Sequence, residues 1–191
     1  MNRTDFARIL TIQDETMQEF LVISAIGEDK SGIINGLSHA ASENGCNILD
    51  TRMTVLGGEF AMIMMISGQA EQIAQAELII PQVADSFGLT TILKRTRPRQ
   101  EADASLPYYI SVVSLDHPGI VREIAGFFSQ REINIEEMET GTYAAAHTGS
   151  PMFSLDIAVK VPAKEAIAPL KEAFIAFCDE RNLDATIEPR R

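Results

Sequence analysis

The chain has 191 residues, a length that allows one large domain or two small ones. Hydrophobic residues make up 46% of it and charged residues 23%, a composition that excludes a largely disordered protein. Its 16 Lys and Arg face 27 Asp and Glu, and the net charge of −11 disfavours a surface built to neutralise nucleic-acid phosphates.

Membrane, disulfide and metal-site classes find no support in the sequence. No apolar run approaches the roughly 18–20 residues that cross a bilayer, and residues 1–20 hold no secretory apolar stretch, so we expect a cytoplasmic protein without membrane association. The two cysteines, Cys46 and Cys178, lie far apart without CxxC or Cys/His spacing. We therefore expect both to be buried, and we expect no metal and no cofactor.

After an N-terminal extension over residues 1–19, the first half of the chain alternates between strand and helix patterns. The helix patterns repeat apolar residues with the 3.6-residue period of one helical face, and the strands are rich in β-branched and apolar residues. In chain order, the prediction is a strand over 21–26, a helix with Ile33, Ile34, Leu37, Ala40 and Ala41 on its apolar face, strands over 48–56 and 60–67 joined by Gly57-Gly58, a helix over 73–87 and a strand over 89–93.

The second half repeats this order at a constant offset of 87 residues. At that offset Asp29 aligns with Asp116 and Gly32 with Gly119, and an Asn-Ile pair follows eighteen residues after each aspartate. The predicted elements are a strand over 109–113, a helix over 120–128 with Val121 on its apolar face, strands over 135–143 and 153–161, a helix over 167–178 and a strand over 183–187.

These orders predict an α+β protein made of two ferredoxin-like βαββαβ domains in tandem. Each domain should place two helices on one face of an antiparallel four-stranded sheet. We predict domains over residues 20–95 and 106–191 with a polar linker over 96–105. Residues 1–93 carry four basic and twelve acidic residues, and residues 106–191 carry eight and thirteen, so both halves are acidic. The basic side chains gather between the halves instead, at Lys94, Arg95, Arg97 and Arg99.

The turn before the first helix of each half carries the residues most suited to binding. A helix N-terminus offers free N–H groups and a positive dipole end, and a glycine there lets a ligand approach the backbone. A carboxylate in the turn can accept from an ammonium group, and an asparagine can both donate and accept. Together these groups complement the two ends of a free amino acid. Helix capping by the turn residues, and a structural role for the asparagines where the helix ends, are the alternatives.

The Asp-x-x-Gly-Ile turn, its helix and the following Asn-Ile resemble the ACT domain, a small ligand-sensing module that regulates amino-acid metabolism. The resemblance covers about residues 20–95 and 106–188, and it implies a ligand held where the turn of one domain faces a second domain. The ligand-binding residues that it implies are Asp29, Ser31, Gly32, Ile33 and Asn47 in the first copy, and Asp116, His117, Gly119, Ile120 and Asn134 in the second. Because the turns differ at Lys30-Ser31 and His117-Pro118, the two sites need not be equivalent.

No catalytic signature accompanies the repeat, whether a Gly-rich phosphate loop, His-Glu-x-x-His or Gly-x-Ser-x-Gly, so we do not expect an enzyme. The resemblance to tandem ACT-domain proteins implies a repressor of transcription that senses an amino acid, glycine or a similar one. It also implies action through a protein partner such as a transcription activator, without direct nucleic-acid contact. Pairing of the domains within one chain and pairing in a homodimer both remain open.

Two other functions are alternatives, and the first differs from the repressor only in the identity of its partner. A regulatory subunit that controls a metabolic enzyme of amino-acid or one-carbon metabolism would share every feature named so far. Direct nucleic-acid binding through the four basic residues between the acidic halves is the weakest reading, because so few cations support only weak phosphate contacts.

Overall fold

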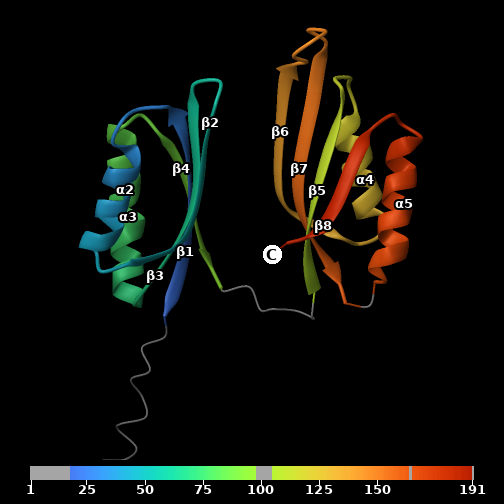
Figure 1. Ribbon diagram of the computed structural model, residues 1–191. Helices are drawn as coiled ribbons and strands as arrows, with labels where there is room; N and C mark the ends of the chain where they lie inside the picture. Colours follow the sequence, from blue (N-terminus) through green and yellow to red (C-terminus); the bar gives the residue numbers. More distant parts are fainter. Residues whose placement is uncertain (1–17, 98–104, 164, 191) are drawn as a thin grey trace, which may run out of the picture. The chain divides into compact units, whose positions relative to one another are not determined.

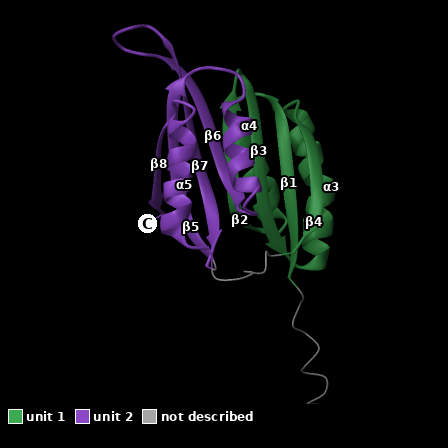
Figure 2. Cartoon of the chain, turned by 90° about the vertical axis from the view of Figure 1, so that its right-hand side faces the viewer, with its two compact units in different colours: residues 1–99 green, residues 100–191 purple. Residues whose placement is uncertain are grey.

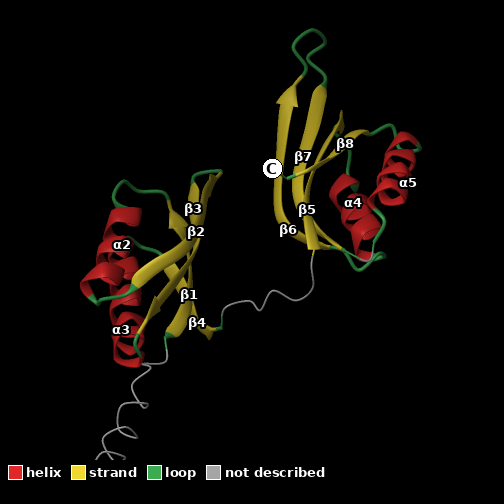
Figure 3. Ribbon diagram, turned by 60° about the horizontal axis from the view of Figure 1, so that its bottom comes forward, coloured by secondary structure: helices red, strands yellow, loops and turns green. Residues whose placement is uncertain are grey.

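Each half of the chain folds into an antiparallel sheet with two helices on one face, as the repeat predicts (Figures 1 and 3). The computed structural model describes residues 18–97, 105–163 and 165–190. The chain divides into two compact units, unit 1 over residues 1–99 and unit 2 over residues 100–191 (Figure 2). Most of the predicted N-terminal extension and residues 98–104 of the predicted linker lie outside the described residues.

Unit 1 contains a sheet in the order β2-β3-β1-β4. Its strand β3 is an inner strand, as its nearly continuous apolar run predicts. The elements, in chain order, are β1 (Glu19–Glu28), α2 (Ile33–Glu43), β2 (Asn47–Leu56), β3 (Glu59–Gly68), α3 (Ala70–Ser86) and β4 (Thr90–Thr96).

Unit 2 repeats this topology with a sheet in the order β6-β7-β5-β8. Its hairpin between β6 and β7 has a longer connection than the Gly57-Gly58 turn of unit 1, as the sequence predicts. The elements, in chain order, are β5 (Ser105–Leu115), α4 (Ile120–Ser129), β6 (Asn134–Ala144), β7 (Pro151–Pro162), α5 (Ile167–Asp179) and β8 (Asp184–Pro189).

Each unit buries its own core between the helices and the inner face of the sheet. In unit 1, alternate residues of β1, such as Leu21 and Ile23, meet Leu37 of α2 and Ile73 of α3. Aromatic rings dominate the core of unit 2, where four phenylalanines of α4 and α5 have centroid separations of 5.0–6.5 Å. These rings are Phe127, Phe128, Phe174 and Phe177.

Three details of the predicted packing were wrong. Ile34 and Val121, assigned to the buried helix faces, are 36% and 38% exposed, because the second position of each helix is rotated about 100° away from the first. The apolar run of β3 also predicts that Met62, Met64 and Met65 all lie in the core, but Met65 is only half-buried because it points to the opposite face of the sheet.

Strand β4 is longer than its apolar residues suggest. It continues through Lys94 and Arg95, which pair with Val22 and Leu21 of β1. The strand continues because its backbone pairs with β1, whereas the hydrophobic pattern indicates only which residues are buried. Two of the four basic residues assigned to the region between the halves are therefore part of the sheet.

The turns that end α2 and α4 show a strained position in unit 2. Gly45 adopts a φ of 72° after α2, and Glu132, its counterpart 87 residues later, adopts a φ of 56° after α4. A side chain in this left-handed region costs roughly 1–2 kcal/mol, a cost that glycine avoids. Unit 2 thus carries a strained residue where unit 1 has the residue best suited to the backbone.

We therefore expect Glu132→Gly to stabilise the chain by about 1 kcal/mol, which raises the melting temperature of unit 2 by roughly 4–8 °C. Calorimetry measures this shift. Glu132→Gln, which removes only the charge, should leave the melting temperature unchanged, and Gly45→Ala should lower it. A melting temperature that falls or stays constant in Glu132→Gly would contradict the assignment of strain.

Candidate functional site

Each glycine-containing turn lies beside the hairpin of its own unit. The backbone N–H of Asp29 donates to the Gly58 carbonyl at 3.0 Å, and that of Asp116 donates to the Pro151 carbonyl at 3.0 Å. These bonds hold the start of each turn while both aspartate side chains remain exposed. The carboxylates can therefore accept from a ligand at the surface.

The glycine of each turn determines how the first helix begins. Gly32 and Gly119 have φ values of 94° and 105°, which a residue with a side chain rarely adopts. The helices start with the bonds from Gly36 N–H to the Gly32 carbonyl at 2.9 Å and from Glu123 N–H to the Gly119 carbonyl at 3.0 Å. Among the residues that the structure describes, no side chain caps either helix, so the N–H groups of the first turn have no side-chain partner there.

This geometry separates the two explanations of the turn residues. Because no side chain caps α2 or α4, capping does not explain Asp29, Ser31, Asp116 or His117. The His117 ring instead lies with its Nδ1 atom 3.3 Å from the carbonyl oxygen of Pro118.

The isoleucines that follow the glycines belong partly to the core. Ile33 and Ile120 are each 2% exposed, with their side chains packed under the helices. Only their backbone N–H groups remain in a position to meet a ligand at the turn. Their assignment as ligand-binding residues therefore concerns the backbone alone.

The structure does not bring the asparagines to the turns of their own units. Asn47 pairs with Ser67 near one end of β3, whereas the turn lies near the other end, where Glu28 pairs with Glu59. The helix between them has 11 residues, a length of about 16 Å at a rise of 1.5 Å per residue. The turn and the asparagine of the same unit therefore cannot both contact one small ligand.

The asparagines also do not close the turns that end the helices. In unit 1 this turn is held by Cys46 N–H, which donates to the Ala41 carbonyl at 3.0 Å, and by the Asn44 side chain, which donates to the Ala40 carbonyl at 2.7 Å. Among the described residues, the side chains of Asn47 and Asn134 make no hydrogen bond. The structural explanation of these two residues was wrong, and both exposed amides are available to a partner.

Lys30 makes the first turn different from the second. Its Nζ atom donates to the carbonyl of Phe87 at 3.0 Å and lies 3.3 Å from Glu28, so the turn is fastened to the end of α3. In unit 2, His117 makes no such bond to α5 within the described part of the chain. Sequence reasoning missed this contact because Lys30 and Phe87 are 57 residues apart. In addition, the acceptor is a backbone carbonyl, which no residue type reveals.

The basic residues between the halves are not free to bind phosphates as a set. The Arg95 guanidinium forms a two-pronged hydrogen bond with the Glu77 carboxylate at 2.8 and 2.9 Å and also pairs with Glu19. This interaction lowers the pKa of Glu77, mainly through the hydrogen bonds from Arg95 and against a smaller opposing effect of burial. Arg95 thus links β1, α3 and β4.

The described residues contain no group of three His, Cys, Asp or Glu side chains that could hold a metal ion. Cys46 and Cys178 are free and buried, as predicted, and burial raises the pKa of Cys178 to about 11. Neither thiol is positioned as a nucleophile at neutral pH. Within residues 18–97, 105–163 and 165–190, none of the helices combines the length and the apolar character of a membrane span.

Comparisons with known proteins agree with this architecture. Residues 19–94 match the ACT domain, and residues 110–168 match the ACT domain of the AHAS small subunit type. The glycine cleavage system transcriptional repressor of Escherichia coli (strain K12) is 33% identical over 172 residues, which cover 89% of this chain and 90% of that protein.

Two solved structures share the fold over nearly the whole chain. One, described provisionally as a glycine cleavage system transcriptional repressor, has 28% identity and a TM-score of 0.70, and the match covers 92% of this chain and 99% of that one. The other, an unknown protein from Galdieria sulphuraria, has 25% identity and a TM-score of 0.79 over 91% and 99% of the two chains.

The Arg95–Glu77 pair predicts a defined pH effect. A glutamate whose pKa is lowered by folding stabilises the folded state above its unfolded pKa, and this contribution disappears as the pH falls through the folded pKa. We expect the Glu77 carboxylate to titrate below its ordinary value of 4.5, and to return towards it in Arg95→Gln. Carboxylate NMR measures both titrations, with Arg97→Gln as the control. An unchanged Glu77 titration in Arg95→Gln would show that the pair does not form in solution.

Proposed function

Because the chain belongs to the family of tandem ACT-domain proteins that includes the glycine cleavage system transcriptional repressor, we propose that it is a non-enzymatic, amino-acid-sensing repressor of glycine cleavage that acts through a protein partner. The observation that carries this proposal is the pair of uncapped helix N-termini, each beside an exposed aspartate, in a chain related to that repressor over 89% of its length. Regulation then requires ligand binding and no chemistry.

A free amino acid suits the turns because its two ends carry opposite charges. Its carboxylate can accept from the N–H groups that begin α2 or α4, where the helix dipole is positive. Its ammonium group can donate to the adjacent carboxylate of Asp29 or Asp116. Gly32 and Gly119 keep the backbone accessible to these atoms. Glycine, which has no side chain to accommodate, is the simplest ligand of this class.

The distance between each turn and the asparagine of the same unit supports a site completed by a second domain. An asparagine from that domain would supply both a donor and an acceptor to the ligand. Binding would then tie two domains together, so that ligand concentration controls how the domains pair. This coupling is how an amino acid could alter a complex with a protein partner.

The charges support action through a protein rather than through DNA. Unit 1 and unit 2 are both acidic, and Arg95 is already engaged by Glu77 and Glu19. A transcription activator is the partner that the relationship to the repressor suggests. Such a partner would supply the contact with DNA that this chain is poorly equipped to make.

A thermal-shift screen across the amino acids, glycine included, tests the sensing function. A ligand that binds only the folded chain raises the melting temperature with concentration, by a stabilisation of about 2.7 kcal/mol at one hundred times Kd. In the Asp116→Asn variant, the first turn should still give a rise in melting temperature with the ligand. Adding Asp29→Asn to this variant should abolish that rise. Glu43→Gln, which removes an exposed carboxylate at the far end of α2, should retain it. No shift with any amino acid would reject the sensing function.

The same measurement tests the two-domain site. In the Asp116→Asn background, we expect either Asn134→Ala or Asn47→Ala to abolish the Asp29-dependent response. Loss with Asn134→Ala indicates that unit 1 pairs with unit 2, within one chain or between two copies, and loss with Asn47→Ala indicates a homodimer in which two copies of unit 1 meet. If both variants retain the response, an asparagine of a second domain does not complete the site.

A further inference from the structure

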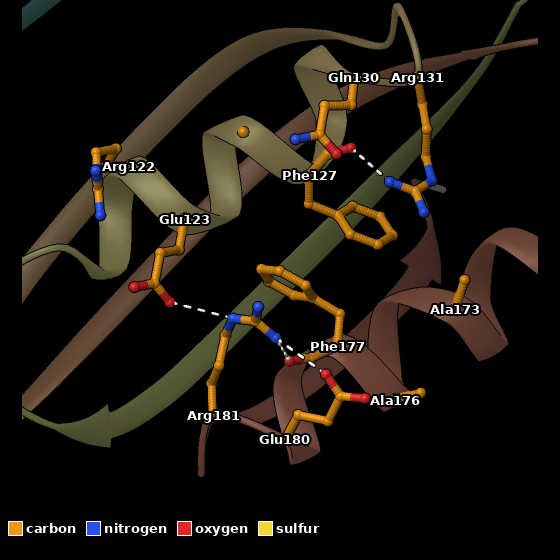
Figure 4. Close-up of a pocket in the computed structure, with 11 residues that line it drawn as sticks. Arg122, Glu123, Phe127, Gln130, Arg131, Ala173, Ala176, Phe177, Glu180 and Arg181 are labelled. Atoms are coloured by element: carbon orange, nitrogen blue, oxygen red, sulfur yellow. Dashed lines mark hydrogen bonds and ion pairs between the residues drawn. The ribbon is translucent and has the colours of Figure 1, made fainter.

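A groove of about 540 Å³ lies between the two helices of unit 2, on the side away from the sheet (Figure 4). In unit 1, α2 and α3 pack closely, and the Phe87 ring leaves no room for a side chain at Gly36. In unit 2, the phenylalanine rings hold α4 and α5 farther apart. A side chain at Gly126 would meet no atom within 4 Å, so the groove is open at this point.

The walls of the groove carry the same Phe-x-x-x-Arg arrangement twice, with each phenylalanine on α4 or α5 and each arginine two residues beyond the end of that helix. Arg131 places its guanidinium 3.7 Å from the centroid of the Phe127 ring and donates to the Phe127 carbonyl at 2.9 Å. Arg181 lies 3.8 Å from the centroid of the Phe177 ring and donates to the Phe177 carbonyl at 2.9 Å. The two rings are in contact, with centroids 5.0 Å apart, so each arginine is held in place by an aromatic floor.

The two arginines differ in their acidic partners. Arg181 lies 3.2 Å from the carboxylate of Glu123, which is one helical turn before Phe127 on the opposite helix. The corresponding position one turn before Phe177 is Ala173, which lines the groove towards the same end as Arg131 (Figure 4). Arg131 makes no ion pair among the described residues. A carboxylate therefore pairs with Arg181, whereas the corresponding position beside Arg131 is vacant.

We propose that this groove binds a partner protein through a segment that places a carboxylate on Arg131 and apolar atoms against the partly exposed Phe177 ring, since Phe127 is only 4% exposed. A guanidinium held by its own backbone and stacked on a ring is already oriented, so little side-chain entropy is lost when a carboxylate binds. The groove is lined by three arginines and two glutamates, although unit 2 as a whole is acidic. An acidic segment thus meets a locally favourable charge there.

The dimensions favour a peptide segment over a free amino acid. A volume of about 540 Å³ falls within the roughly 300–1,000 Å³ of sites that hold drug-sized ligands, and the groove runs between two helices. Docking of a peptide segment into such a groove is a common recognition mode. This inference rests on the proposed action through a protein partner, and it names a surface far in sequence from the Asp29 turn.

Selection of random dodecapeptides displayed on phage, with the full chain as bait, tests the groove without a known partner. We expect the selected peptides to share an Asp or Glu next to apolar residues. Their affinity should fall about tenfold or more in Arg131→Gln, because a charge-assisted hydrogen bond is lost. Ala173→Glu should cause the same loss of affinity, because a carboxylate of the chain itself would then occupy the position beside Arg131 that the peptide needs. Lys171→Gln, a loss of charge on α5 outside the groove, should change affinity less than twofold.

The proposal is overturned if no peptide is enriched over selection on Ala173→Glu, if the enriched peptides lack acidic residues, or if Arg131→Gln binds them as the wild-type chain does. Millimolar acetate or glycine that shifts the NMR signals of Arg131 would indicate a small-molecule site instead. A change of oligomeric mass in Ala173→Glu would indicate a second copy of the chain.

Failure of the groove proposal can be distinguished from failure of the proposed sensing function. Ala173→Glu and Arg131→Gln are expected to retain the amino-acid response in thermal shift, because both lie outside the glycine-containing turns. A chain that responds to amino acids but selects no acidic peptide overturns the groove alone. A chain that selects acidic peptides without any amino-acid response overturns the sensing function alone.

Discussion

The left-handed backbone at Gly32 and Gly119 is the constraint on which the rest of each unit depends. It lets the chain leave the first strand and enter the first helix within a short turn, so that the helix lies back across its own sheet. The same conformation leaves the start of the helix without a side-chain cap. One steric requirement thus builds the fold and leaves the first N–H groups of each helix, which belong to the candidate site, without a side-chain cap.

Duplication of this fold has produced two units with different surfaces. In unit 1, Lys30 fastens the turn to the end of α3, and the two helices pack closely around Phe87. In unit 2, aromatic rings separate the helices and open a groove, while His117 makes no bond to α5 within the described residues. An amino-acid site and a protein-binding surface can therefore occupy different parts of one small chain.

Much of the fold could be predicted because secondary structure follows local periodicity. Alternation in β1 and the helical period of α2 describe which side of each element is buried. The errors arose where a residue is apolar but faces outward, as at Ile34 and Met65, since composition alone does not report orientation at the edge of a buried face. Strand β4 was underestimated because pairing through Arg95 depends on the neighbouring strand.

By itself, the sequence determined the tandem repeat, the βαββαβ order and the glycine-containing turns, because these depend on residues close together in the chain. The tertiary structure alone showed that Asn47 lies a helix length from Gly32. It also showed that Glu123 forms an ion pair with Arg181, whereas the corresponding residue near Arg131 is Ala173, which has no carboxylate. Distances between elements arise from how side chains of different sizes pack, and no local pattern encodes them.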